Sequence, residues 1–199
     1  MLTTNGARLF SSMTTKRNFS QQSAASPGKL SHVNKDGSLP NMVDVGHKAV
    51  TKRTARARSI VDLPEHVYQA LASTANADTG SVGELTGAKG PIITTAIIAG
   101  VMGAKKTSEL IPFCHPLAID NCAVDISVEP EPKAGRRNVV VDCEVKCTGR
   151  TGVEMEALTG ATVASLCVYD MCKALSHDIL IKETALVSKT GGKRDFDGR

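Results

Sequence analysis

Two segments of strictly alternating residues constrain this chain more than any other feature. From Cys122 to Glu129, and again from Val139 to Cys147, every second residue is apolar. This period of two matches the pleat of a β-strand, and a polar loop of residues 130–137 joins the segments. The pattern predicts an antiparallel hairpin with one face turned toward a hydrophobic core. Helices elsewhere in the chain must cover that face.

Helix and strand signals elsewhere complete the predicted fold. Prolines open two segments at a position that a first helical turn tolerates, and Thr151-Gly-Val-Glu154 has the spacing of a capping box. We predict strands in residues 43–62 and 179–188, a loop at 76–90, and helices at 64–75, 91–110 and 151–175. This order predicts an α+β sandwich, in which helices pack on one face of a mainly antiparallel sheet.

The first 35 residues differ in composition from the rest. They hold five basic and no acidic residues and are rich in Ser, Thr, Ala and Gln. This composition is typical of a mitochondrial transit peptide, which predicts a location in the mitochondrial matrix; a merely disordered tail is the alternative. Residues 36–199 form the predicted folded domain.

Charge and hydrophobicity argue against two classes of protein, nucleic-acid-binding proteins and proteins with a membrane-spanning helix. Beyond the tail, 19 basic residues nearly balance 20 acidic ones, and aromatic residues are only 3% of the chain, which disfavours a nucleic-acid-binding domain. No apolar run approaches the roughly 18 residues of a membrane span.

Six cysteines lie in apolar, periodic stretches without a CxxC pair. We interpret them as reduced core thiols rather than disulfides, and their spacing predicts no metal site.

Three polar clusters are candidates for chemistry. Cys114-His115-Pro116 is either an ordinary turn or a turn that presents a histidine to a phosphate or base. Asp170 and Lys173 are i,i+3 neighbours in an apolar helical stretch. On a helical wheel, Glu156 shares one broad polar edge with this pair. An exposed charged edge and a catalytic group explain that edge equally well.

The third cluster is basic. Lys189 and Lys193 flank Gly191-Gly192, whose backbone amides are suited to approach a phosphate, although no P-loop motif is present. The other basic candidates are Arg53, Arg56, Arg58 and Lys89. Glu154, at the start of a helix, has a structural explanation in the helix dipole.

Five segments of the chain carry a resemblance to one family. They are NMVDV (41–45), KKTSELIPFCHPL (105–117), TGRTGVEMEAL (148–158), VYDMCKA (168–174) and SKTGGK (188–193). Over about residues 32–196, the chain closely resembles the cyclic pyranopterin monophosphate synthases (protein C of molybdenum cofactor biosynthesis), in their mitochondrial eukaryotic form.

The resemblance implies a ferredoxin-like subunit in a homohexamer, a trimer of dimers with active sites at the dimer interface. It implies a phosphorus–oxygen lyase without a cofactor. Its substrate is a cyclic dihydroguanosine triphosphate made by an upstream radical enzyme, and its products are the cyclic pyranopterin monophosphate and pyrophosphate. It implies no nucleic-acid or membrane partner.

The resemblance also assigns roles to residues. Asp170, Lys173 and Lys89 are the implied acid–base residues, and clustered cations would depress a lysine pKa toward neutrality. The implied substrate contacts are Phe113, Cys114, His115, Met155, Glu156 and Glu154, with Arg53, Lys189 and Lys193 for the triphosphate.

One departure from the family pattern keeps two other functions open. Ile97 stands where the family usually has Arg, which favours a non-catalytic nucleotide-binding subunit as an alternative. A ferredoxin-like RNA-binding module is the second alternative, which the neutral domain and scarce aromatics disfavour.

Overall fold

The computed structural model describes residues 39–72, 84–130 and 133–198. The predicted transit segment therefore lies outside the described residues, as do the end of the predicted first helix and most of the loop after it. Among the described helices, none is both long and apolar enough to cross a bilayer.

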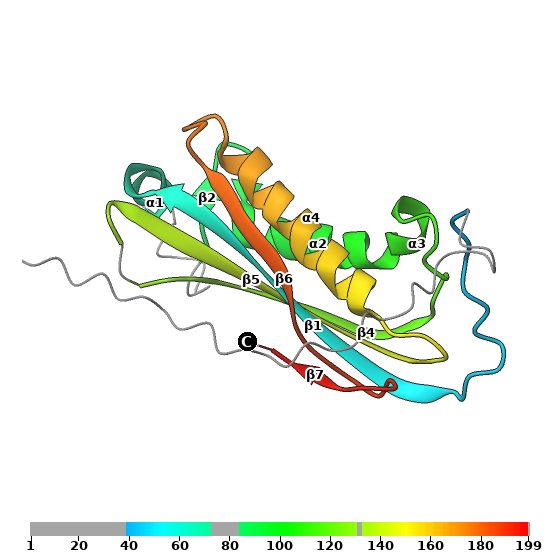
Figure 1. Ribbon diagram of the computed structural model, residues 1–199. Helices are drawn as coiled ribbons and strands as arrows, with labels where there is room; N and C mark the ends of the chain where they lie inside the picture. The colour runs from blue at the N-terminus through cyan, green and yellow to red at the C-terminus, as the bar shows by residue number, and fades with distance from the viewer. Residues whose placement is uncertain (1–38, 73–83, 131–132, 199) are drawn as a thin grey trace, which may run out of the picture. The chain divides into compact units, whose positions relative to one another are not determined.

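One antiparallel sheet forms the framework of the domain. Its five strands stand in the order β4-β5-β1-β6-β7, and every neighbouring pair is antiparallel (Figure 1). The predicted hairpin is β4 paired with β5, with Cys122 opposite Val145 and Val128 opposite Val139. The strands are β1 (Thr51–Pro64), β4 (Ile119–Val128), β5 (Arg136–Gly149), β6 (Leu180–Thr190) and β7 (Phe196–Asp197).

Two helices cover one face of this sheet, where α2 and α4 lie side by side (Figure 1). The chain order β1-α2-β4-β5-α4-β6, together with the strand order, is that of a ferredoxin-like fold, so the predicted fold class is confirmed. The helices are α1 (Glu65–Ala72), α2 (Ile92–Lys105), α3 (Thr107–Leu110) and α4 (Glu154–Cys172). A short ladder of β2 (Thr86–Gly87) and β3 (Gly90–Pro91) precedes α2.

Three predicted boundaries are wrong. The helix predicted over 91–110 breaks at Lys106, where the buried hydroxyl of Thr107 donates a hydrogen bond to the Ala104 carbonyl at 2.9 Å. No capping box forms: α4 begins at Glu154, with Val153 as a cap residue that makes no side-chain bond. Residues 43–50 form no strand, since β1 begins at Thr51.

Small residues let α4 approach both α2 and the sheet closely. A methyl group added at Gly160 would lie 2.6 Å from the Cys143 sulfur and 3.3 Å from the Gly100 carbonyl oxygen. One added at Gly103 would lie 2.7 Å from the Val163 side chain. The helix-facing side of the sheet is correspondingly closed, and Ala57 and Cys143 are fully buried there. All six cysteines are free thiols, as predicted.

The Gly160 contact generates a stability prediction. Gly160→Ala should lower the free energy of unfolding by about 1–2 kcal/mol in urea denaturation, because overpacking outweighs the better helix propensity of Ala. In a Cys143→Ala background the same substitution should be neutral or stabilising, because the obstructing sulfur is gone. Equal destabilisation in both backgrounds would contradict this account of the contact.

Candidate functional site

A carboxylate held between two lysines lies at the C-terminal end of α4. Asp170 is in the last turn of the helix, and Lys173 directly follows the helix. The Lys173 amine lies 2.6 Å from one carboxylate oxygen of Asp170, and the Lys89 amine lies 2.7 Å from the other. Lys89 comes from the turn between β2 and β3, 81 residues away in sequence, and also donates to the Asp170 carbonyl. All three side chains are about half exposed.

The two lysines set the proton affinity of this group. Hydrogen bonds from Lys173, and next from Lys89, lower the pKa of Asp170 to about 2. In return, the hydrogen bond and charge of Asp170 raise the pKa of Lys173. The expectation of a depressed pKa is therefore wrong for Lys173, because its nearest charged neighbour is an anion.

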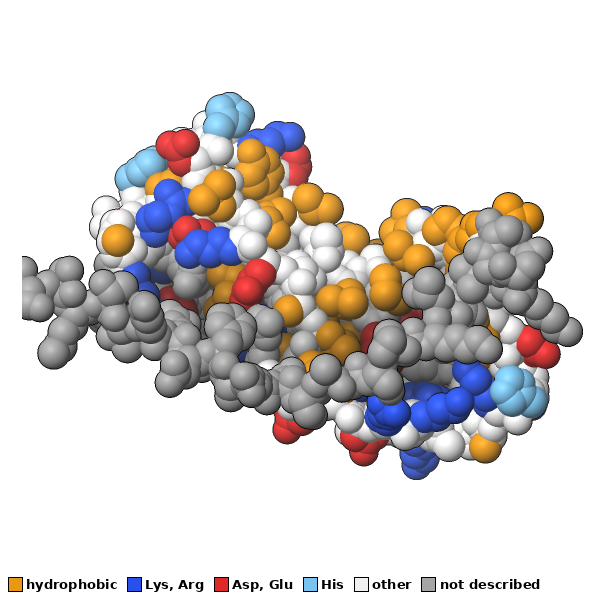
Figure 2. Space-filling model, viewed as in Figure 1, with side chains coloured by type: hydrophobic (Ala, Val, Ile, Leu, Met, Phe, Trp, Pro, Cys, Tyr) orange, Lys and Arg blue, Asp and Glu red, His pale blue; other side chains and the backbone are white. Residues whose placement is uncertain are grey.

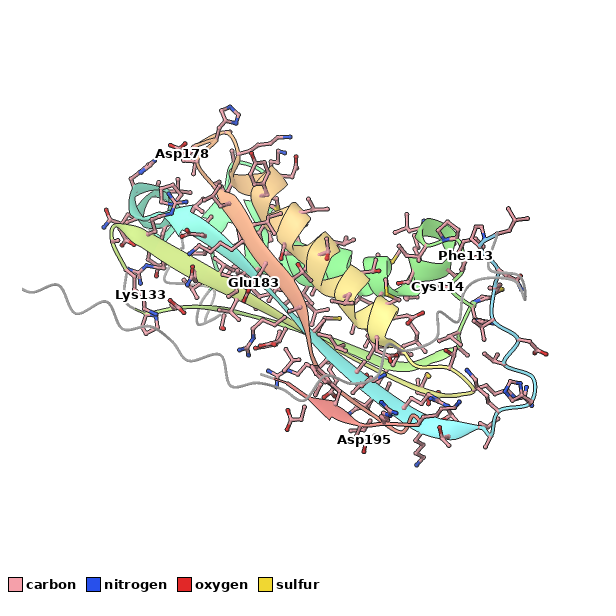
Figure 3. The ribbon with its side chains drawn as sticks, in the orientation of Figure 1. Phe113, Cys114, Lys133, Asp178, Glu183 and Asp195 are labelled. Atoms are coloured by element: carbon pink, nitrogen blue, oxygen red, sulfur yellow. The ribbon has the colours of Figure 1, made fainter. Side chains whose placement is uncertain are left out.

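The implied base-contacting residues gather at the other end of α4. Phe113 and Cys114 follow α3 (Figure 3), and Met155 and Glu156 lie in the first turn of α4. Burial raises the pKa of the Cys114 thiol, and the nearby charge of Glu156 raises it further. Phe113 and Met155 expose more than a third of their surface, and His115 is partly buried in the same turn as Cys114.

Glu156 corrects the predicted polar edge of α4. Its side chain is only 5% exposed, whereas Asp170 is half exposed. Burial raises the pKa of Glu156, and repulsion by Glu154 adds to the effect. The helical wheel gives the relative angle of these two carboxylates, but it does not reveal that neighbouring elements bury Glu156 and leave Asp170 exposed.

Two residues of the basic cluster, Arg53 and Lys189, lie near that same first turn of α4. Arg53 donates to the carbonyls of Gly149 and Arg150 at 3.0 and 3.2 Å, and Lys189 contacts Glu154 at 2.8 Å. Lys193 is exposed in the loop after β6. Figure 2 shows Lys and Arg side chains gathered at the end of the sheet where β1 begins.

Two expectations about the basic cluster change in the structure. The Gly191 amide already donates to the Asp195 carboxylate at 3.0 Å, so it does not point to an open phosphate site. Arg56 and Arg58 project from the opposite face of the sheet, where both contact Asp142 at 3.1 and 2.8 Å.

The implied site residues thus form separate groups in one chain. From Glu156 to Asp170 the helix rises about 21 Å at 1.5 Å per residue. In Figure 3, Phe113 and Cys114 lie near the N-terminal end of α4, whereas Asp178, in the loop after α4, lies at the other end. Within one chain, the two groups therefore lie at opposite ends of α4.

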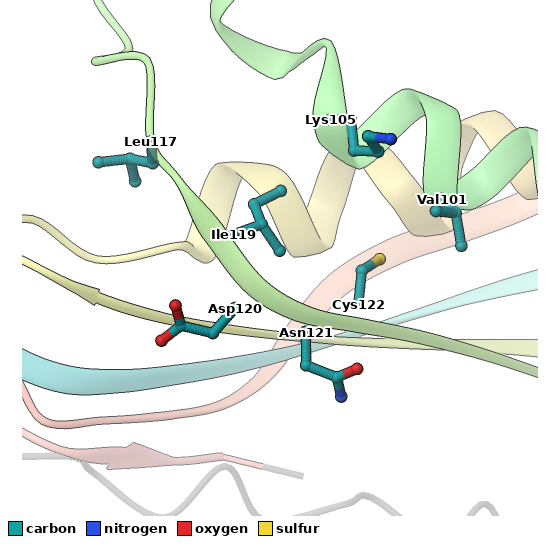
Figure 4. A pocket seen from close by; sticks show the side chains of 7 residues that line it. All are labelled: Val101, Lys105, Leu117, Ile119, Asp120, Asn121 and Cys122. Atoms are coloured by element: carbon teal, nitrogen blue, oxygen red, sulfur yellow. The ribbon is translucent and has the colours of Figure 1, made fainter.

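A hollow of about 400 Å³ between α2 and β4 holds none of the predicted site residues (Figure 4). The single acidic residue among those that line it, Asp120, accepts a hydrogen bond from the Thr148 hydroxyl at 2.8 Å. In the sequence, the only sign of this hollow is the pair of consecutive polar residues Asp120-Asn121, which interrupts the alternation. In the structure, the pairing of β4 with β5 is irregular at this point. The residues that line the hollow are Val101, Lys105, Leu117, Ile119, Asp120, Asn121 and Cys122. Within the described residues, no three His, Cys, Asp or Glu side chains are grouped to hold a metal ion.

Burial of Glu156 generates a pH prediction. A carboxyl group whose pKa is raised by folding stabilises the protein below its ordinary pKa of about 4.3, and that stabilisation is lost as the pH rises through the folded value. Glu156→Gln should therefore increase the urea midpoint at pH 7–8 and change it much less at pH 4. A lower midpoint at pH 7–8 would show that the ionised carboxylate is stabilised in the folded protein.

Known proteins match the part of the chain that carries the sequence motifs. The model of the MoaC family matches residues 42–192. The cyclic pyranopterin monophosphate synthase of Xanthomonas oryzae pv. oryzae is 52% identical over 168 residues, 84% of this chain and 93% of that protein. The synthase of Helicobacter hepaticus is 46% identical over 83% of this chain and 94% of its own length.

A longer relative also matches. Molybdenum cofactor biosynthesis protein 1 of Dictyostelium discoideum is 51% identical over 172 residues, which are 83% of this chain but only 26% of that protein. Since the family model covers most of the chain and the bacterial synthases are matched over nearly their whole length, this chain belongs to the MoaC family.

Proposed function

We propose that this protein is a cyclic pyranopterin monophosphate synthase of molybdenum cofactor biosynthesis. It rearranges a cyclic dihydroguanosine triphosphate into the pterin tricycle, expels pyrophosphate and closes a cyclic phosphate. The observation that carries the proposal is the Asp170 carboxylate held between two lysine amines, in a member of a family whose bacterial relatives bear that enzyme name. Such a cluster supplies both a proton donor and a fixed counter-charge.

Lys173 is the proton donor in this proposal. It enters the reaction as an ammonium, which the hydrogen bond and charge of Asp170 stabilise, and its pKa is raised accordingly. Asp170 remains ionised, since its pKa is about 2, and orients both amines. Positioned proton transfer of this kind typically contributes about 10²–10⁴-fold to a rate.

The groups at the N-terminal end of α4 suit a purine-derived triphosphate. Arg53, Lys189 and Lys193 supply cations for the phosphates, and charge-assisted hydrogen bonds to phosphate oxygens are strong. Phe113 and Met155 offer exposed apolar surface to the ring system. Cys114, His115, Glu154 and Glu156 complete the proposed substrate contacts.

We propose that a second copy of the chain completes each site. The separation of about 21 Å along α4 supports this, since the acid–base group and the substrate-contact group must come from different copies to meet one guest. Exposed apolar side chains on the helix layer, Ile98, Met102 and Leu166, support association between copies. Figure 2 shows hydrophobic side chains gathered over the helices. The proposed assembly is a hexamer built from such dimers.

We also propose that residues 1–35 direct the protein to the mitochondrial matrix, where a radical enzyme supplies the substrate. Their five basic and no acidic residues support this. Deleting these residues should abolish import of a fluorescent fusion into mitochondria, whereas Lys146→Ala, which changes a surface charge of the folded domain, should leave import intact. Import of the truncated fusion would contradict the proposal.

The shared site generates a complementation prediction. Lys173→Ala and His115→Ala should each lower turnover of the cyclic dihydroguanosine triphosphate by at least about 10²-fold, because each removes one half of every site. Co-expressed and co-purified through different tags, the two inactive variants should recover about a quarter of wild-type activity, since about half of the dimers are mixed and each mixed dimer holds one intact site. Pyrophosphate release and formation of the cyclic monophosphate measure the outcome.

Lys146→Ala is the matched control, because this exposed lysine pairs with Glu144 on the helix-free face of the sheet. It should retain full activity. A mixture as inactive as its components would refute sharing of the site between copies, and full activity of Lys173→Ala would remove that residue from the mechanism. If the wild-type protein binds the substrate but forms no product, that result would favour the alternative based on Ile97, a non-catalytic nucleotide-binding subunit.

A further inference from the structure

The first turn of α2 is capped from outside the helix by Glu84. The residue before the helix, Pro91, has no side-chain acceptor, so the first amides of α2 need another partner. One oxygen of the Glu84 carboxylate accepts the Ile93 amide at 2.8 Å. The other accepts the Thr94 amide at 3.1 Å and the Thr94 hydroxyl at 2.7 Å. A carboxylate at this place also interacts favourably with the helix dipole.

The same contacts close the base of the hairpin that carries Lys89. The Ile92 amide donates to the Leu85 carbonyl at 2.8 Å, directly beside the Glu84 cap. Beyond this bond, β2 pairs with β3, and the turn of Ala88 and Lys89 is completed by Gly90. Gly90 has φ of +102°, which a residue with a side chain rarely adopts. Both ends of the hairpin are therefore fixed to the start of α2.

Packing places this hairpin against the end of α4. A methyl group added at Gly87 would lie 3.5 Å from the Ile92 side chain and 3.7 Å from the Met171 carbonyl, which neighbours Asp170. Ile92 is fully buried, and Leu85 is 4% exposed. The backbone two residues before Lys89 thus lies so close to the helix that carries its ion-pair partner that a single methyl group would bridge the gap.

The ion pair of Lys89 with Asp170 does not order the hairpin by itself. Both side chains are about half exposed, and exposed pairs contribute little to stability. The charge-assisted bonds of Glu84 are each stronger than neutral ones, and three of them converge on one carboxylate. The position of the Lys89 amine therefore depends on contacts made by residues that lie outside the acid–base group.

We propose that Glu84 is a positioning residue, whose carboxylate caps α2 and thereby fixes the hairpin that holds the Lys89 amine against Asp170. The inference rests on the acid–base role proposed for Lys89. Glu84 itself does not contact Lys89, Asp170 or Lys173, so it acts only through the backbone of residues 85–92.

Two measurements on the full-length protein test this proposal. The first is the rate of acetylation of the Lys89 amine, read by mass spectrometry without any substrate and with the exposed Lys52 as the internal reference. Glu84→Ala should raise that rate to the level seen in Asp170→Asn, because the amine is no longer held in the ion pair. Glu84→Gln, which keeps one acceptor oxygen, should give an intermediate rate.

The second measurement is steady-state turnover. In Glu84→Ala, kcat should fall by about 10²-fold with little change in KM, because the substrate-contact groups lie at the other end of α4. Glu84→Gln should restore part of kcat. Glu144→Gln is the matched control: it removes a carboxylate charge on the helix-free face and should change neither readout.

The outcomes separate this inference from the proposed function. Unchanged acetylation of Lys89 in both Glu84 variants would overturn the positioning role, whatever the activity. Faster acetylation with unchanged kcat would support the positioning of Lys89 and instead remove Lys89 from the proposed chemistry. If Glu84→Ala does not fold, the partial acetylation and partial kcat loss of Glu84→Gln decide the question, and wild-type values there would overturn the proposal.

Discussion

The close packing of α4 against both α2 and the sheet is the constraint on which the rest of the structure depends. A methyl group at Gly160 would lie 2.6 Å from the Cys143 sulfur and 3.3 Å from the Gly100 carbonyl oxygen, so a larger residue there would force these layers to shift. This contact fixes a rigid helix across the sheet. Along this helix the backbone rises about 21 Å from Glu156 in the first turn to Asp170 in the last.

The carboxyl groups at the two ends of α4 differ in exposure, and their pKa values shift in opposite directions. Asp170 is exposed between two lysines, and its pKa falls to about 2. Glu156 is buried beside another carboxylate, and its pKa rises. The surroundings of the two carboxyl groups therefore shift their pKa values in opposite directions on one helix. In this way a fold keeps one carboxyl group ionised while another holds a proton more readily.

The basic side chains near the first turn of α4, and the Gly191 amide, already have hydrogen-bond partners inside the protein. Lys189 contacts Glu154, Arg53 contacts two backbone carbonyls, and the Gly191 amide contacts Asp195. A polyphosphate at this place would exchange these contacts for its own oxygens. For the triphosphate that we propose as substrate, several negative charges would compete for these groups more effectively than the single charge of one carboxylate.

The sequence by itself determined the hairpin, the order of helices and strands, and the pairing of Asp170 with Lys173, because strand alternation and i,i+3 neighbours are local geometry. Its motifs also determined the family. Tertiary structure alone decided that Lys89 pairs with Asp170, 81 residues away in the sequence, and that Glu156 is buried. It also decided that Glu154 pairs with Lys189 and does not form a capping box. Those contacts depend on which surfaces pack together, and a periodic pattern shows which face of an element is apolar but not what covers it.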